Sequence, residues 1–227
     1  MIRSTPTALE IQGGNLVLQG LDLASWELIE PHLQHVALMA GEILEEKGQQ
    51  ASYLYFPVAG GISVEDGEEG IQVALVGRND MVGCSLLLNG LAGTRAVVMF
   101  EGSGLRLSAE AVAECLECNR ELHRHLLSWL NTFIAEMSQT VRASALGTIE
   151  QRLAYWLLTA AKCLDTDVFV ISHEMLSRLL GVRRTGVTVA LHDLVEKKVL
   201  RTGHRRVHIL DWERLIMASG PLRPHTS

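Results

Sequence analysis

The 227-residue sequence is poor in cysteine and has no long apolar run, and these two absences exclude whole classes of protein. No stretch approaches the ~20 uninterrupted apolar residues that a membrane-spanning helix requires, and the first residues lack the apolar core of a signal peptide. The four cysteines are too few for a disulfide framework in a chain of this length, so we expect reduced thiols. We therefore expect a cytoplasmic protein without a membrane partner.

The sequence also lacks the motifs that mark common enzyme classes. It contains no Gly-x-Ser-x-Gly elbow, P-loop, HExxH or dinucleotide-binding fingerprint. The acidic segments GEILEE (41–46) and EDGEEG (65–70) are typical of solvated turns. We expect neither catalytic residues nor enzymatic activity.

A metal or redox centre has little support in the sequence. Cys115 and Cys118 lie one helical turn apart and could share a metal or be oxidised, but scattered thiols are more often buried apolar groups. No third ligand accompanies the histidine pairs, which are His32 with His35 and His123 with His125. We expect no metal site, and a redox role for the two cysteines stays open.

Charge is divided unevenly along the chain. Residues 1–147 hold 8 Lys/Arg and 18 Asp/Glu, a net charge of −10, whereas residues 148–227 hold 12 Lys/Arg and 8 Asp/Glu, a net charge of +4. A basic segment that follows an acidic body is attracted to phosphates, which the body repels. Chance clustering of surface charge would give the same numbers.

Short β-rich segments broken by glycine fill the region from 36 to 107. They are YLYFPV (53–58), GISVED (61–66), IQVALVG (71–77), RAVVMF (95–100) and GLRLS (104–108). Twelve of the 20 glycines lie between 41 and 104, which is the turn chemistry of a compact β-roll or jelly roll. We expect an amphipathic helix over 22–33, and a helix capped by Ser108 that continues past Asn119.

An apolar residue recurs every three or four positions from about 119 to 145, which predicts a long helix with a single apolar seam. These residues are Leu122, Leu126, Trp129, Phe133, Met137 and Val141. The seam could pack on the chain's own β-roll or pair with its twin across a dimer axis. Because a helix of this length extends beyond a small β-roll, we favour dimerisation through these six residues.

The next segment has the spacing of a helix-turn-helix. Thr148 and Gln151 form the pattern of a capping box at the start of a helix over 148–161. Ser172 caps a second helix, Gly181 ends it, and a third helix begins near Arg183. The apolar residues of the third helix lie in its later turns, so its cationic N-terminal end is expected to face outward and enter a DNA major groove.

The segment VLRTGHRRVHIL (199–210) predicts two short strands around a turn, which we interpret as a wing whose arginines lie beside the DNA backbone. An ordinary helical pair with a solvated basic hairpin would share this pattern. The candidate DNA-binding residues are Ser172, Arg183, Arg184, Thr185, Thr188, His192, Arg201, Arg205 and Arg206.

The whole arrangement resembles the Crp/Fnr family of bacterial transcription regulators. The most specific parts are ISHEMLSRLLGVRRTGVTVALHDLVEKKVL (171–200), which is similar to the family's helix-turn-helix, and YFPVAGGISV (55–64), which is similar to the β-roll of some members. The resemblance implies an α+β fold with a cyclic-nucleotide-binding-like β-roll (1–118), a dimerisation helix (119–146) and a winged helix-turn-helix (147–227). It further implies a homodimer on a palindromic operator in double-stranded DNA, with RNA polymerase as a further partner.

The match is uneven in the recognition helix and in the ligand site. Arg184 keeps the leading arginine of the family's recognition helix, but Thr185 stands in place of a glutamate and Val189 in place of a second arginine. Two base contacts of the family are therefore absent, so its usual operator should not be assumed. Gly186 costs ~1 kcal/mol relative to alanine inside a helix, which indicates close approach to DNA or simple tolerance.

Cyclic-nucleotide binders of the family carry a Gly-Glu pair and, later, Arg-Ser or Arg-Ala. In VGCSLLLNGLAGTRAVV (82–98), Arg95 and Ala96 fit the second part, but Cys84 replaces the glutamate and is a poor acceptor for a ribose hydroxyl. Arg95 could still bind a phosphate or a neighbouring carboxylate. The candidate effector residues are Gly83, Cys84, Arg95, Ala96 and Ser138, and the effector is left unknown. The alternative function is a sensing or interaction module that keeps the fold without specific DNA binding.

Overall fold

The structure is a computed structural model that describes residues 14–222 except 69 and 89. The chain divides into two compact units, one of residues 1–64 and 76–133 and one of residues 65–75 and 134–227. The outer ends of the predicted first and last parts, residues 1–13 and 223–227, lie outside the described residues. Within the described ranges no helix is both long and apolar enough to span a membrane.

The first unit is built on an antiparallel sheet, which confirms the predicted β-roll class of fold. The strands are β1 (Gln34–Leu38), β2 (Ile43–Glu45), β3 (Tyr53–Asp66), β4 (Ile71–Val76) and β5 (Arg95–Ser108). The end of β3 and all of β4 except Val76 are counted in the second unit. Their order is β1-β5-β3-β4, and β2 also pairs with β5. In the β1–β5 register Gln34 lies opposite Arg106 and Leu38 opposite Gly102. The short helices η1 (Glu30–His32) and η2 (Cys84–Leu88) connect parts of this unit.

The long strands β3 and β5 each join two segments that the sequence predicts as separate strands. Their glycines allow close crossing rather than chain reversal. A Cβ on Gly102 would lie 2.1 Å from the carbonyl oxygen of Ala59, and a Cβ on Gly60 would lie 2.5 Å from that of Phe100. Gly60 also has a φ of +84°, which L-residues rarely adopt. Glycine therefore marks bends within two continuous strands.

Three helices of the first unit each begin at a capping residue whose side chain accepts a hydrogen bond from the helix backbone. Asn15 caps α2 (Leu16–Gln19) and Asp22 caps α3 (Leu23–Ile29), so the helix predicted over 22–33 is shorter and ends in η1. The Ser108 hydroxyl accepts a hydrogen bond from the Ala111 amide and begins α4 (Ala109–Cys118), as predicted. Their apolar faces join one core with the sheet; its buried residues include Leu18, Trp26, Ile29, Leu54, Phe56, Leu105 and Val112.

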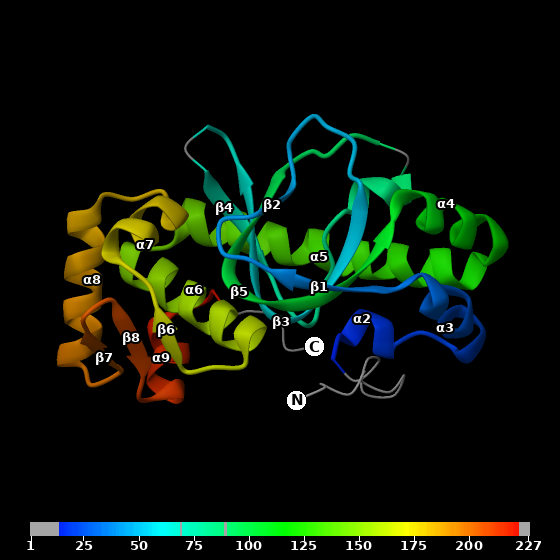
Figure 1. Cartoon of the computed structure of the whole chain (residues 1–227). Helices are drawn as coiled ribbons and strands as arrows, with labels where there is room; N and C mark the ends of the chain where they lie inside the picture. Colours follow the sequence, from blue (N-terminus) through cyan, green and yellow to red (C-terminus); the bar gives the residue numbers. More distant parts are fainter. Residues whose placement is uncertain (1–13, 69, 89, 223–227) are drawn as a thin grey trace, which may run out of the picture. The chain divides into compact units, whose positions relative to one another are not determined.

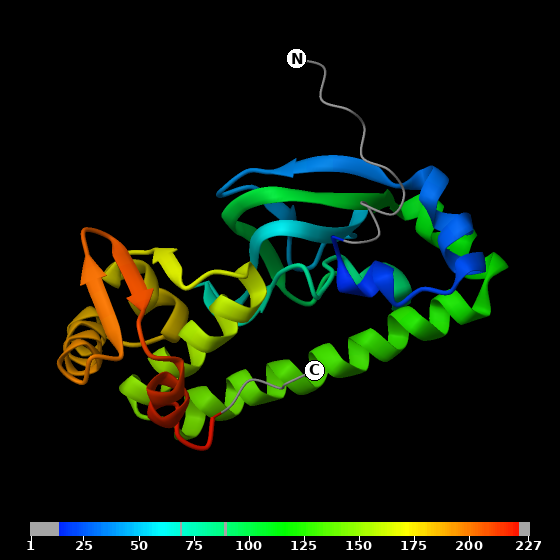
Figure 2. The same ribbon diagram turned by 90° about the horizontal axis from the view of Figure 1, so that it is seen from below.

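The helix capped by Ser108 does not continue past Asn119, contrary to the prediction. Asn119 has an extended backbone, with φ −135° and ψ 104°. Its side-chain oxygen accepts hydrogen bonds from the amides of Glu121 and Leu122. It therefore caps a new helix, α5 (Arg120–Leu146), which Figure 2 shows as one long rod.

In the second unit, helices α6 (Ile149–Leu164), α7 (His173–Leu180), α8 (Arg184–Glu196) and α9 (Trp212–Ala218) surround an apolar core. The predicted capping box is confirmed, because Thr148 and Gln151 each accept a hydrogen bond from the other's backbone amide. The core contains an edge-to-face pair of Trp156 and Phe169, whose ring centroids lie 6.1 Å apart. Its other buried residues include Leu153, Leu157, Leu176, Leu179, Val187, Leu191, Leu194 and Leu215.

A small antiparallel sheet of order β6-β8-β7 completes the second unit. Its strands are β6 (Val168–Val170), β7 (Leu200–Gly203) and β8 (Arg206–Ile209). The β7–β8 hairpin (200–209) is the predicted wing, with Leu200 opposite Ile209 and Gly203 opposite Arg206. Figure 1 shows this hairpin beside α8.

Candidate functional site

Local chain chemistry fixes the turn between α7 and α8. The Ser172 hydroxyl accepts a hydrogen bond from the Met175 amide at 3.1 Å and begins α7. Gly181 ends α7 in the left-handed conformation, at φ 58° and ψ 42°, and its amide bonds back to the Arg178 carbonyl. Arg183 precedes α8 without a side-chain cap, while its carbonyl accepts the Gly186 amide. The N-terminus of α8 therefore keeps its positive partial charge without a capping side chain.

Helix α8 separates a buried face from an exposed one. Val187, Ala190, Leu191 and Leu194 are 0–4% exposed and face the core. The opposite face is exposed and forms one stripe at helical spacing, which we call the α8 stripe: Arg184, Thr185, Thr188, Val189, His192 and Glu196. Because the buried face anchors the helix, the stripe is free to enter a groove. Gly186 owes its place to packing against α6, since a Cβ there would lie 2.6 Å from Cδ1 of Ile149.

Some polar groups of the α8 stripe already form hydrogen bonds within the chain, and others do not. The Thr188 hydroxyl donates to the Arg184 carbonyl at 3.1 Å and lies 3.0 Å from His173 Nδ1. Arg184 Nε lies 4.0 Å from a carboxylate oxygen of Glu174, and both side chains are exposed. Thr188 and Ser172, two of the predicted DNA-binding residues, therefore have hydrogen bonds within the unit, whereas Arg184 is held only loosely.

The wing adds three exposed arginines to the same unit. Arg205 lies at the wing tip with φ 54°, a conformation that costs energy for a non-glycine residue and is often found at functional positions. Arg201 Nη2 lies 3.1 Å from Nδ1 of His208, whose Nε2 lies 3.2 Å from a carboxylate oxygen of Asp167. If Arg201 donates to Nδ1, His208 is neutral and its Nε2–H donates to Asp167, which holds Arg201 on the exposed side of the wing.

His192, Asp193 and Glu196 offer ligand atoms that lie within 4.8 Å of one another. All three belong to one turn near the end of α8, and the ring of His192 lies 3.8 Å from the Glu196 carboxylate. Exposed groups of this kind are common without a metal, so this cluster alone does not mark a metal site.

The seam predicted for dimerisation divides into two faces of α5. Leu122, Leu126 and Phe133 are 2%, 3% and 9% exposed in the chain, and Trp129 donates its indole N–H to the Asn79 carbonyl. Leu122 and Leu126 belong to the core of the first unit, and the partly buried Trp129 packs against that core. The exposed apolar residues of α5 include Ile134 and Val141, which are 55% and 61% exposed.

Two of the predicted effector residues line a cavity in the first unit. A cavity of about 200 Å³ in the first unit is lined by Gly83 and Cys84, but Arg95 and Ala96 are not among its lining residues. Arg95 Nε instead lies 3.4 Å from a Glu46 carboxylate oxygen, though this buried nitrogen makes no hydrogen bond. Ser138 belongs to the second unit, where its hydroxyl donates to the Ile134 carbonyl.

The chemistry of the 200 Å³ cavity is acidic and apolar. The Ser85 hydroxyl donates to Glu45 Oε1 at 2.9 Å, and burial raises the pKa of Glu45 despite this bond. Burial, with the charge of Glu45, raises the pKa of the Cys84 thiol to about 12. Cys84 is therefore a neutral thiol at physiological pH, and a cyclic phosphate would find no guanidinium in this lining.

We expect Glu45→Gln to stabilise the protein at pH 7. Because the folded-state pKa of Glu45 is raised, its desolvation penalty is absent below the unfolded-state pKa and fully present above the folded-state pKa. The gain should therefore shrink as the pH falls to 4, since Glu45 is then increasingly protonated. Urea midpoints at the two pH values measure this, with the exposed Glu117→Gln as control. An equal shift at both pH values would contradict the buried carboxylate.

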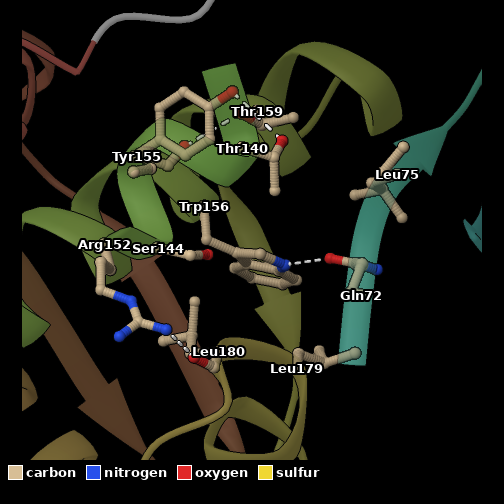
Figure 3. A pocket seen from close by; sticks show the side chains of 12 residues that line it. Gln72, Leu75, Thr140, Ser144, Arg152, Tyr155, Trp156, Thr159, Leu179 and Leu180 are labelled. Atoms are coloured by element: carbon tan, nitrogen blue, oxygen red, sulfur yellow. Dashed lines mark hydrogen bonds between the residues drawn. The ribbon is translucent and has the colours of Figure 1, made fainter. Parts of the chain in front are cut away.

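A second cavity, in the second unit, is too small for an effector. Figure 3 shows it between α6, the end of α5 and β4, where the Trp156 indole N–H donates to Gln72 Oε1 at 2.6 Å. Its volume is about 30 Å³, which is room for little more than a water molecule. Arg152 closes one side by donating to the Leu180 carbonyl.

The fold and this site define a class: a β-roll protein with a winged helix-turn-helix whose recognition helix presents an exposed cationic end. Residues 151–217 match the family model described as a Crp-like helix-turn-helix domain. Residues 151–217 therefore carry a helix-turn-helix of the Crp type, and much of the chain is similar to curated transcription regulators.

Two curated relatives and a solved structure are similar to more of the chain than this domain. The chain is 29% identical to the global nitrogen regulator of Nostoc sp. over 176 residues, which is 71% of this chain and 78% of the relative. It is 22% identical over 211 residues to the CRP-like cAMP-activated global transcriptional regulator of Mycobacterium tuberculosis, covering 88% and 94%. A CRP-family regulator of Thermus thermophilus shares the fold, with a TM-score of 0.69, 21% identity and coverage of 86% and 100%.

Proposed function

We propose that this regulator binds a palindromic operator as a homodimer, with the α8 stripe in the major groove and the wing beside the phosphates. The observation that carries the proposal is the separation of α8 into a fully buried face and an exposed face whose N-terminal end is cationic. Arg184 is placed to contact guanine O6 and N7, because bidentate arginine is the commonest specific base contact. Arg183, Arg201, Arg205 and Arg206 are assigned to the backbone, which positions the protein without reading sequence.

The dimer interface proposed here keeps Met137 and Val141 of the predicted seam and adds two other residues of α5. Ile134 and Val141 lie seven residues apart on α5 and are exposed, so they form a stripe that a second copy of the helix can cover. Leu130 and Met137, both partly exposed, lie on the same side at helical spacing. Two copies joined here would present two α8 helices, as a palindromic site requires.

The three-part organisation, with parts at 1–118, 119–146 and 147–227, belongs to the same proposal, as does contact with RNA polymerase in the cytoplasm. For the effector we favour a small ligand that suits the Glu45 and Ser85 lining over a cyclic nucleotide. Arg95, which would have to bind the phosphate, is paired with Glu46.

Selection of bound fragments from random duplex DNA tests the proposed function. We expect one enriched palindrome with half-sites about one helical turn apart. If the four backbone arginines of both subunits each neutralise a phosphate, the plot of log affinity against log salt should have a slope of about −7. No enriched sequence, together with no duplex binding at low salt, would favour the sensing or interaction module instead.

A further inference from the structure

The middle of the α8 stripe is apolar. Val189 is 59% exposed although it lies on the helix proposed to enter the groove. Thr185 lies one turn before it, on the same face, and is also exposed. The two side chains carry three methyl groups at helical spacing, two on Val189 and one on Thr185.

The neighbouring polar groups are either already hydrogen-bonded or lie toward the two ends of the stripe. The hydroxyl of neighbouring Thr188 donates to the Arg184 carbonyl and lies within hydrogen-bond distance of His173 Nδ1. It therefore has little capacity left for a hydrogen bond to a base. Arg184 occupies the N-terminal end of the stripe, and Glu196 at the other end carries a charge that phosphates repel. The base edge opposite Thr185 and Val189 thus meets an apolar surface.

We infer that Thr185 and Val189 form a methyl-reading pair that selects thymine in each half-site by contact with its C5-methyl group. This inference rests on the proposed function. In the major groove only thymine among the four DNA bases presents a methyl group, and apolar side chains are its usual partners. A cytosine at the same place would leave its N4–H₂ donor desolvated against valine, so the pair also disfavours the other pyrimidine.

Replacement of thymine by uracil in the selected operator tests the pair, because uracil lacks only the C5-methyl and keeps every hydrogen-bonding group. Scanning each thymine of a half-site, we expect one position where uracil weakens binding by about fourfold per half-site, the factor for one buried methyl-sized group. Uracil in both half-sites should weaken binding by about fifteenfold, if the half-sites act independently.

The loss should depend on Val189. In Val189→Ala, an exposed position where folding is not at risk, most of the preference for thymine over uracil at that position should be lost, because only the Thr185 methyl of the pair remains. Val170→Ala, which trims a valine that is 63% exposed on β6, is the matched control and should keep the full discrimination.

Two results overturn the inference while leaving the proposed function in place: an operator in which no thymine is sensitive to uracil, or a sensitivity that Val189→Ala retains. Failure to select any operator overturns the proposed function and the inference together. A thymine-sensitive position that loses its sensitivity only in Val189→Ala supports the pair.

Discussion

Replacing Arg184 with alanine is expected to weaken binding to the selected operator by about 1–3 kcal/mol per half-site. Arg184 begins α8, and among the described residues its one ion pair is with exposed Glu174 at 4.0 Å, so its guanidinium is available to a base. The loss should be specific to one base pair, so Arg184→Ala should bind operators with that pair exchanged almost as well as the original. Fluorescence anisotropy on the selected and exchanged duplexes measures both effects.

Two further variants show whether charge alone explains the result. Arg184→Lys keeps the charge but loses the planar pair of donors, so we expect most of the base preference to be lost. Arg124→Ala removes the same charge from the first unit, where Arg124 pairs only with Glu121 among the contacts of the described chain, and should bind as the wild type does. If Arg184→Ala weakened all duplexes equally, Arg184 would be a phosphate contact and not a base contact.

The second large effect concerns the dimer. Ile134→Glu combined with Val141→Glu would place four unpaired carboxylates in an apolar interface, and we expect dimer affinity to fall by at least about a thousandfold. Both positions are more than half exposed within the chain, so each subunit should fold unchanged. Sedimentation velocity should show a monomer, and operator affinity should fall because a monomer binds only one half-site.

The matched control for this change is Ser128→Glu combined with Ala135→Glu, on another exposed face of α5. It adds the same charge to the same helix and should leave the dimer intact. A dimer that survives Ile134→Glu with Val141→Glu would show that the interface lies elsewhere. A monomer in both double variants would show that charge on α5, and not burial of this stripe, controls assembly.

Helix α5 has two apolar faces, one packed on the first unit and one proposed to contact a second copy of the chain. Leu122, Leu126 and Phe133 attach the helix to the first unit, whereas Ile134 and Val141 are left for a partner. The helix can therefore pack on the first unit and form the proposed dimer contact without sharing side chains between the two tasks. A change at one face should leave the other intact, which is why the glutamate variants are expected to fold.

Local elements were predictable because their causes are local. Ser108, Thr148 and Ser172 cap helices through hydrogen bonds that span three residues, and Gly181 ends α7 through its own left-handed conformation. The two strands of the wing and the helix-turn-helix followed from apolar spacing over short distances. The same short-range reasoning failed at Gly60 and Gly102, since glycine supports a turn or a close crossing equally well and only the neighbouring strand decides between them.

The sequence by itself determined the β-rich and helical segments and the cationic end of α8, because capping, periodicity and charge are properties of short segments. Only the tertiary structure decided which apolar residues of α5 are already buried, that Thr188 is engaged by His173, and that Arg95 pairs with Glu46. It also decided that Val189 is exposed. Each of these depends on contacts between residues distant in the chain or on which side of a helix faces the core. Helical periodicity shows which residues share a face, but it does not show what packs against that face.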